Sequence, residues 1–315
     1  MEIAQRSRRA GRIIAVGGGK GGAGKTFVCA NLGLALAQRG FRVVLLDADL
    51  GGANLHTVLG MSPPLATLSD FVARRASLND IAVGTPFPGL RLIAGALDDA
   101  HAANPAHQQK MRLLRHLGSL DTDFLLLDLG AGTAFNIVDF FLIANHGLLV
   151  VRPEPTSVEN AYRFLKAAFL RRLQSVGRVF AIEDIVEEAR EHRNSLGLHT
   201  PADILRVIHE RDPELGRQVQ EQMRAFSPRL IVNEVRVDAG FNDASVVGDM
   251  ASACRRFFGI QLEALGAIPE DDAVRKSVRA RQPLYHSAPS SAARRAIDEV
   301  ADRLLALDRV RERAA

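Results

Sequence analysis

The stretch Gly19-Lys20-Gly21-Gly22-Ala23-Gly24-Lys25-Thr26 decides the fold of this 315-residue chain. It fits the pattern G-x-x-x-x-G-K-[ST], whose glycines let consecutive backbone N–H groups turn inward around phosphate oxygens. An apolar β-branched run precedes it at residues 12–16, and an apolar helix-forming run follows at residues 31–37. This order predicts a phosphate-binding loop, because the helix N-terminus adds positive dipole at the anion. We expect Lys25 to reach the β- and γ-phosphates and the Thr26 hydroxyl to bind Mg²⁺.

Apolar strands and helical stretches alternate along most of the chain. Strands are predicted at residues 12–16, 41–46, 90–93, 123–127, 146–151, 230–232 and 262–268, and helices at 31–37, 105–117, 157–173, 244–258 and 291–307. Near-continuous apolar strands separated by helices are typical of a mostly parallel sheet covered on both faces. We therefore predict a doubly wound α/β fold that forms a single domain over residues 1–315.

One long segment breaks this alternation, because no strand is predicted between about residues 171 and 226. Thr200-Pro201 and Asp212-Pro213 each have the form of a helix N-cap followed by proline at the first helical position. The apolar residues after each pair have the spacing of short amphipathic helices. We expect a helical insertion within the domain at about 171–226, and a flexible basic segment at residues 1–11.

The composition excludes several classes of protein. The chain is 47% hydrophobic and 24% charged, which is ordinary for a globular protein, and no apolar run approaches the roughly 18 residues of a membrane span. The basic N-terminus lacks the apolar core of a secretory signal. Cys29 and Cys254 are too few for a disulfide framework or a zinc site, so a cytoplasmic location is expected. The net charge of +4 is not diagnostic of an anionic partner.

A second lysine within the loop, Lys20, narrows the interpretation. With Lys20 and Lys25, the loop resembles that of the deviant-Walker ATPases, the MinD/ParA family of SIMIBI-like P-loop proteins. The resemblance implies ATP and Mg²⁺ as ligands, bound by residues 19–26 and by the following Phe27. It also implies a homodimer that sandwiches the nucleotide, in which the signature lysine, matched by Lys20, touches the ATP of the partner.

Carboxylates follow two of the predicted strands. Asp47 and Asp49 stand two residues apart at a strand end, so both can face the same crevice at the carboxyl edge of the sheet. The resemblance assigns Asp47, Asp128 and Thr26 to the metal, and Asp49 to activation of the attacking water, with Lys20 and Lys25 assisting catalysis. The resemblance also implies that the turn after Asp128 senses the γ-phosphate. Its Gly-Ala-Gly form, residues 130–132, is similar to the flagellar-number branch of the family.

Two later strand ends resemble those that hold adenine in this family. The resemblance implies that Asn233 binds the base edges, and that Pro269 and Asp271 belong to the opposite wall of the adenine site. The chain also departs from the family. Phe27 replaces a Thr or Ser whose hydroxyl would contact phosphate, and Leu129 replaces a small or polar residue. These departures leave the rate of hydrolysis open.

The resemblance predicts an ATP-dependent switch for spatial positioning or partitioning, of a division site, a flagellum, a chromosome or another cargo. Hydrolysis of ATP to ADP and phosphate would be slow and stimulated by a protein partner. One alternative is a nucleotide-gated adaptor with little turnover. Another is ATP-dependent, non-specific DNA binding through the basic runs at residues 275–281 and 171–172.

Other functions have less support in the sequence. The apolar stripe formed by Ile297, Val300, Leu304 and Leu307 predicts a core-facing helix, since the other helix faces lack the strongly basic character of a membrane-surface helix. A nitrogenase-like iron protein would need cysteines placed to bridge a cluster, and both cysteines fall inside predicted helices. Nothing indicates the second substrate pocket of a synthase. The surface that the dimer engages, whether membrane, DNA or protein, is left open.

Overall fold

The computed structural model describes residues 11–49, 52–95, 107–180, 182, 200–236 and 245–314, and these form one eight-stranded sheet. The strand order is β3-β4-β2-β5-β1-β6-β7-β8, and all neighbours are parallel except β3 and β4. The strands are β1 (Arg12–Gly17), β2 (Val43–Ala48), β3 (Val83–Gly84), β4 (Leu90–Ile93), β5 (Phe124–Leu129), β6 (His146–Val151), β7 (Arg229–Val235) and β8 (Glu263–Pro269). The predicted doubly wound α/β fold is confirmed.

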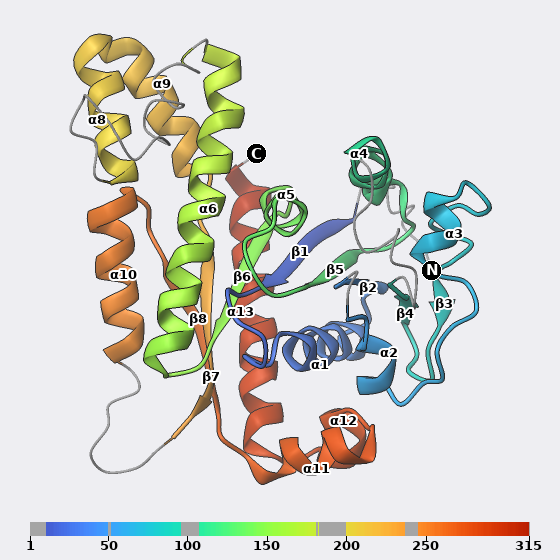
Figure 1. Ribbon diagram of the computed structural model, residues 1–315. Helices are drawn as coiled ribbons and strands as arrows, with labels where there is room; N and C mark the ends of the chain where they lie inside the picture. The colour runs from blue at the N-terminus through green and yellow to red at the C-terminus, as the bar shows by residue number, and fades with distance from the viewer. Residues whose placement is uncertain are drawn as a thin grey trace.

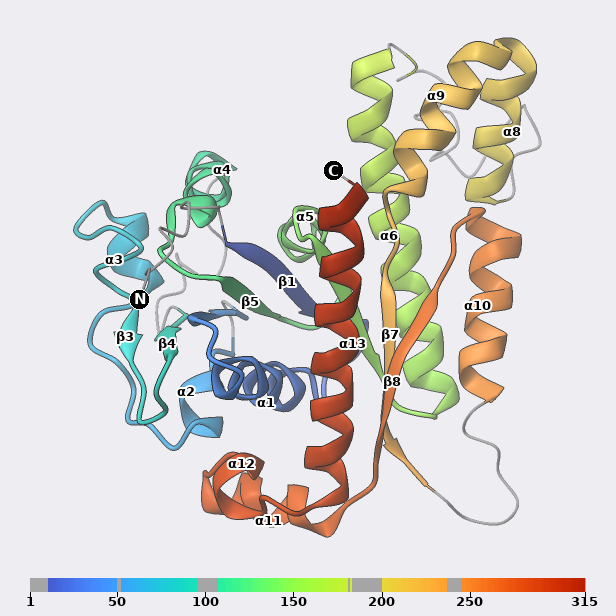
Figure 2. The same ribbon diagram turned by 180° about the vertical axis from the view of Figure 1, so that it is seen from behind.

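Helices cover both faces of the sheet (Figures 1 and 2). On one face lie α1 (Lys25–Gln38), α2 (Leu55–Val58), α11 (Asp272–Ala280), α12 (Leu284–Ser287) and α13 (Ala292–Ala314). On the other lie α3 (Leu68–Val72), α4 (His107–His116), the short 3-10 helix η1 (Leu117–Ser119), α5 (Phe135–Leu142), α6 (Pro155–Phe180) and α10 (Ser245–Phe258). Two further helices, α8 (Pro201–Arg211) and α9 (Pro213–Arg224), pack beside the far half of α6.

Strand residues alternate between the two faces and are buried on both. In β1, Ile14 and Val16 belong to the core beneath α1 and α13, whereas Ala15 belongs to the core beneath α5 and α6. All three residues are fully shielded from solvent. A strand covered on both sides has no polar face, which is why the strands could be recognised as continuous apolar runs.

The elements agree with the predicted ones, with informative differences. The two-residue strand β3 was not predicted, because so short an edge strand carries no periodicity. The predicted caps are confirmed, since the Thr200 and Asp212 side chains accept hydrogen bonds from the first turns of α8 and α9. Helix α6 continues to Phe180, past the predicted start of the insertion at about residue 171, and the insertion itself stays a prediction. The expected flexible segment lies, for residues 1–10, outside the described residues.

The C-terminal helix packs into the core as predicted. Ile297, Val300 and Leu304 are at most 1% exposed and lie against α1 and β8. Leu307 completes the same stripe in a half-buried position. In the part of the chain that the structure describes, no helix combines the length and apolar character of a membrane span.

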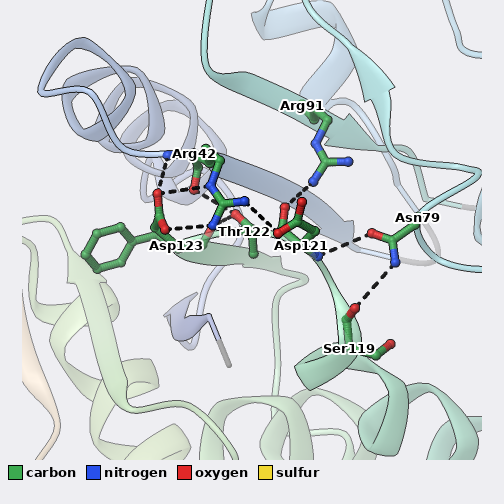
Figure 3. A network of polar contacts seen from close by, with 8 residues as sticks. Arg42, Asn79, Arg91, Ser119, Asp121, Thr122 and Asp123 are labelled. Carbon is green, nitrogen blue, oxygen red and sulfur yellow. Dashed lines mark hydrogen bonds and ion pairs between the residues drawn. The ribbon is translucent and has the colours of Figure 1, made fainter. Parts of the chain in front are cut away.

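A polar network closes the edge at which β2, β4 and β5 begin (Figure 3). The Arg42 guanidinium pairs with Asp121 at 2.6 Å and with Asp123 at 3.0 Å. Arg91 donates to the carbonyl oxygen of Asp121, and the Asn79 side chain accepts from its backbone N–H. Exposed ion pairs of this kind contribute about 1 kcal/mol or less each, so the network mainly fixes the loop that enters β5.

A buried ion triad joins α4, α5 and α6. Asp139 accepts hydrogen bonds from Lys110 Nζ at 2.5 Å and from the Arg171 guanidinium at 2.7 and 3.1 Å. Burial alone would raise the pKa of Asp139, but the hydrogen bonds from Arg171 and Lys110 outweigh burial and hold the pKa below its usual value. Because Arg171 is committed to this triad, it does not contribute a free charge to the predicted basic run at Arg171 and Arg172.

We expect Asp139→Asn to lower the free energy of unfolding by about 3 kcal/mol, because the Lys110 ammonium, only 5% exposed, loses its counter-charge. Urea denaturation at neutral pH measures the loss. The contribution of Asp139 is present above the ordinary carboxylate pKa and is lost as pH falls through the lowered folded-state pKa, so the difference should shrink in acid. The control Glu159→Gln removes an exposed pair with Arg163 and should cost less than about 0.5 kcal/mol. Equal costs for the two variants would contradict the assignment.

Candidate functional site

The phosphate-binding loop joins the end of β1 to the start of α1 at the carboxyl edge of the sheet (Figure 1). A methyl group at Gly19 would lie 1.9 Å from the carbonyl oxygen of Asn160 on α6, so only glycine fits there. Gly24, the N-cap of α1, has a φ of 90°, which glycine adopts without strain. The N–H groups of the first turn of α1 have no partner within the helix, an arrangement that binds phosphate.

Lys25 is the buried lysine of the loop. It is 8% exposed, and its Nζ donates to the carbonyl oxygen of Lys20 at 3.2 Å. Burial lowers the pKa of Lys25, whereas the charges of Asp128 and Asp49 raise it. The side chain therefore lies within the field of the site's carboxylates, where an anionic phosphate would be a further partner.

Lys20 occupies a different environment in the same loop. Its side chain is 45% exposed, and its Nζ lies 3.8 Å from the Glu154 carboxylate. The Nζ also donates to the Thr156 hydroxyl at 3.1 Å. Both partners lie at or just before the start of α6, so the ammonium of Lys20 rests on the α6 side of the loop.

Asp47 and Asp128 end neighbouring strands and lie side by side. They are register partners in β2 and β5, and each is 1% exposed. The Asp47 carboxylate accepts hydrogen bonds from the backbone N–H groups of Asp49 at 3.2 Å and Leu55 at 2.9 Å. Burial nevertheless raises the pKa of Asp47 to about 6. Burial also raises the pKa of Asp128, and the charge of Asp47 raises it further.

The Asp128 carboxylate has the surroundings of a cation ligand. Neither of its oxygens has a hydrogen-bond partner among the described residues, although the nearby Thr26 hydroxyl acts to lower its pKa. A buried carboxylate without a partner is costly. Within the described ranges no three His, Cys, Asp or Glu side chains are grouped to hold a metal alone. The oxygen donors Thr26, Asp47 and Asp128 fit Mg²⁺, which binds one or two carboxylates and completes its shell with water and phosphate.

Asp49 faces the turn that follows β5. A methyl group placed on Gly130 would lie 2.9 Å from Asp49 Oδ1, and the same carboxylate borders Gly52. The turn therefore passes directly over the Asp49 carboxylate, and a side chain at position 130 would displace that carboxylate. The residue predicted to activate water and the turn predicted to sense the γ-phosphate are in contact.

Asn233 connects the predicted adenine end of the site to the phosphate loop. It is 5% exposed at the end of β7, and its Nδ2 donates to the carbonyl oxygen of Ala23 at 3.0 Å. The sequence did not predict this contact, since it joins residues 210 positions apart. Asn233 thus has a structural task in the loop, and its contact with a base edge stays a prediction.

Two other predicted contact residues use their side chains elsewhere. The Asp271 carboxylate caps α11 by accepting from Ala273 N at 2.8 Å, and it also accepts from Ala293 N at 3.1 Å. The predicted adenine wall is therefore left to the backbone around Pro269. The Phe27 side chain is 7% exposed and belongs to the core beneath α13, so any phosphate contact of Phe27 is left to its N–H group.

Sequence reasoning missed a line of charges at this edge. Arg152, just after β6, pairs with Glu154 at 3.2 Å and with Glu234 at 2.6 Å. Since Glu154 also pairs with Lys20, alternating charges run from the loop to the end of β7. The signal was present in the Arg-Pro-Glu sequence at residues 152–154, because polar residues after a parallel strand lie at the carboxyl edge.

Comparisons with known proteins agree with this site. A family model described as the CobQ/CobB/MinD/ParA nucleotide binding domain matches residues 14–284. The antiactivator FleN of Pseudomonas aeruginosa is 30% identical over 295 residues, covering 93% of this chain and 86% of FleN. The cell division ATPase MinD of Pyrococcus furiosus superposes with a TM-score of 0.63 at 26% identity, covering 94% of this chain and 99% of MinD.

A second solved structure supports the fold alone, because its identity is lower. The septum site-determining protein MinD from Pyrococcus horikoshii, complexed with Mg-ADP, superposes with a TM-score of 0.62 at 24% identity. The match covers 93% of this chain and 95% of that protein.

We expect Asn233→Ala to weaken the binding of both ATP and inorganic triphosphate about fivefold, since the loop loses a hydrogen bond that fixes the Ala23 carbonyl. Isothermal titration calorimetry measures both affinities. The control Asn79→Ala removes an exposed amide at the opposite edge of the sheet and should change neither. Weaker ATP binding with unchanged triphosphate binding would show that Asn233 acts on the base alone.

Proposed function

Because this chain belongs to the CobQ/CobB/MinD/ParA family of nucleotide-binding proteins, we propose that it is an ATP-dependent dimerising switch that positions or partitions a cellular structure. Two relatives support this role. Over most of its length the chain is similar to FleN, which is an antiactivator, and to MinD, which is a cell division ATPase. In this proposal ATP closes a homodimer, the dimer engages its target, and slow hydrolysis to ADP and phosphate releases it.

The different environments of the two loop lysines carry the proposal. Lys25 is buried among the carboxylates of its own site, whereas Lys20 is exposed and, among the described residues, its side chain contacts Thr156 and Glu154. A second ammonium at the surface of a phosphate loop is available to the nucleotide of a facing subunit. The position of Lys20 therefore favours a site that is completed by a second copy of the chain.

The chemistry we propose depends on positioning and charge. Lys25 and the first turn of α1 hold the β- and γ-phosphates, and Thr26, Asp47 and Asp128 hold Mg²⁺ directly or through water. The metal ion, when bound, neutralises charge that develops on the phosphate oxygens. Asp49 orients the attacking water, and Lys20 of the facing subunit stabilises the transferred phosphoryl group.

The target surface is the less defined part of the proposal. We favour a protein partner that stimulates hydrolysis, with the protein in the cytoplasm or peripherally at the membrane or nucleoid. The burial of the α13 stripe removes the predicted apolar face as a membrane anchor. DNA binding is left to α11 and its C-cap, where Lys276, Arg279 and Arg281 are exposed. The alternative, a nucleotide-gated adaptor, would use the same site as the proposed switch and would differ from it in hydrolysing ATP more slowly.

Three substitutions test the switch. We expect Lys25→Ala to abolish ATP binding, Lys20→Ala to bind ATP but stay monomeric, and Asp49→Ala to accumulate as a dimer in ATP because release requires hydrolysis. Size-exclusion chromatography with light scattering gives the oligomeric state. The control Lys166→Ala removes an exposed lysine of α6 and should behave as the native protein. A monomeric Asp49→Ala variant in saturating ATP would contradict the proposal.

The contact between Asp49 and Gly130 gives a sharper test. We expect Gly130→Ala to displace the flexible Asp49 carboxylate, slowing hydrolysis at least about tenfold while ATP affinity stays within about twofold. Gly118→Ala is the control, since a methyl group there meets nothing within 4 Å. Steady-state phosphate release measures the rate. Native turnover by Gly130→Ala would remove Asp49 from the water-activating role.

The rate of ATP hydrolysis distinguishes the candidate targets when it is measured for the protein alone, with anionic liposomes and with duplex DNA. Stimulation by one of them identifies the surface. We expect neither to stimulate, because Arg171 is engaged by Asp139, the α13 stripe is buried, and the exposed cations on α11 and its C-cap form only a short basic run. A protein partner then remains. Strong stimulation by liposomes would overturn this expectation.

A further inference from the structure

A cavity of about 360 Å³ lies at the opposite end of the sheet from the phosphate loop. It is half open to solvent and is bordered by the end of α5, the start of β6, the second half of α6 and the linker from α9 to β7. Phe141 and Phe226 form apolar walls, with ring centroids 6.4 Å apart in an edge-to-face arrangement. Gly147 forms part of the lining, and the Phe141 ring lies directly over it, since a methyl group there would be 2.6 Å from the ring. This volume falls in the range typical of small-molecule sites.

Arg172 is the one charged residue among the ten described residues that line the cavity. Arg172 Nε is shielded from solvent and has no hydrogen-bond partner in the described part of the chain. The guanidinium makes one long hydrogen bond, 3.3 Å, to the carbonyl oxygen of Gln222 at the end of α9. A carboxylate would be a stronger partner than this carbonyl, because charge-assisted bonds to arginine are short and can be bidentate.

Among the described residues, the neighbouring acid does not supply that carboxylate. Asp139, the acid of the adjacent triad, is already bonded to Lys110 and Arg171. Asn145 and Ser227 line the cavity and add neutral polar groups beside Arg172. The site thus combines an under-bonded cation, neutral hydrogen-bonding groups and aromatic walls.

We propose that this cavity is a second ligand site, which binds a carboxylate carried on an apolar body. The guanidinium of Arg172 pairs with the carboxylate, and the apolar part of the ligand packs against the wall that the Phe141 and Phe226 rings form together. The site is independent of nucleotide, although α5 connects it to the turn after Asp128, since α5 begins at Phe135 and ends at the cavity wall. Occupancy of the cavity is therefore placed to influence that turn.

Phenylacetate is the probe for a free carboxylate, and the dipeptide acetyl-Phe-Asp-amide is the probe for one carried by a peptide. We expect saturable binding of at least one, measured by calorimetry with saturating ADP present so that the phosphate loop is blocked. Binding by phenylacetate alone indicates a small molecule, and binding by the dipeptide alone indicates a peptide segment. The neutral isostere phenylacetamide should bind at least about tenfold more weakly, because it cannot form the charge-assisted pair.

Arg172→Gln should weaken binding of the carboxylate about tenfold or more, whereas Arg163→Gln, an exposed arginine of the same helix, should leave it unchanged. Ala225→Leu adds bulk at the exposed edge of the cavity and should also reduce binding, with Arg172 intact. This second variant keeps the test decisive if Arg172→Gln is poorly folded in a thermal melt. The absence of saturable binding by both probes, or equal binding by Arg172→Gln, would overturn the proposal whatever the ATPase activity.

Discussion

The burial of Asp47 beside Asp128 under the phosphate loop is the constraint on which the site depends. Parallel pairing of β2 and β5 in register forces these two acids together, and the sheet shields both from water. The pKa of Asp47 rises to about 6, above its ordinary value, so the stability that it contributes is present in acid and is lost as pH rises through that value. At neutral pH the two buried carboxylates therefore cost stability, and a ligand that supplies a cation offsets this cost by binding the folded state alone.

The sequence determined the architecture and the central chemistry. The strands could be recognised because both of their sides are buried, and Asp47, Asp49 and Asp128 because carboxyl ends of parallel strands meet at one edge. The helix caps at Thr200 and Asp212 were also predictable, since capping depends on three or four consecutive residues. Local pattern was sufficient wherever the determining contacts are local or repeat along a strand.

The remaining features depend on side-chain directions that no local pattern encodes. Asp271 stands where the family motif suggests an adenine contact, but it bonds Ala293 across 22 positions and holds α11 to α13. Arg171 was predicted to belong to a basic run, but its guanidinium is bonded to Asp139 of α5. The Asn233 amide already donates a hydrogen bond to the Ala23 carbonyl oxygen of the phosphate loop, so this N–H group is not free for a base. In each case a polar side chain that the sequence suggested for a ligand or partner is used in a hydrogen bond to a residue far away in the sequence.

The strength of the contacts made by Lys20 suits a reversible switch. Its bonds to Thr156 and Glu154 are exposed, so together they are worth about 1 kcal/mol or less, and in the proposed dimer their exchange for the phosphate of a facing subunit costs little. Lys25 could not make such an exchange, because removing it would leave Asp128 buried without a nearby cation. Lys20 and Lys25, five positions apart, thus differ in how readily they can change partners, because one is exposed and the other is buried. In the proposed dimer, the exposed lysine contacts the second subunit, and the buried lysine holds the phosphate site in monomer and dimer alike.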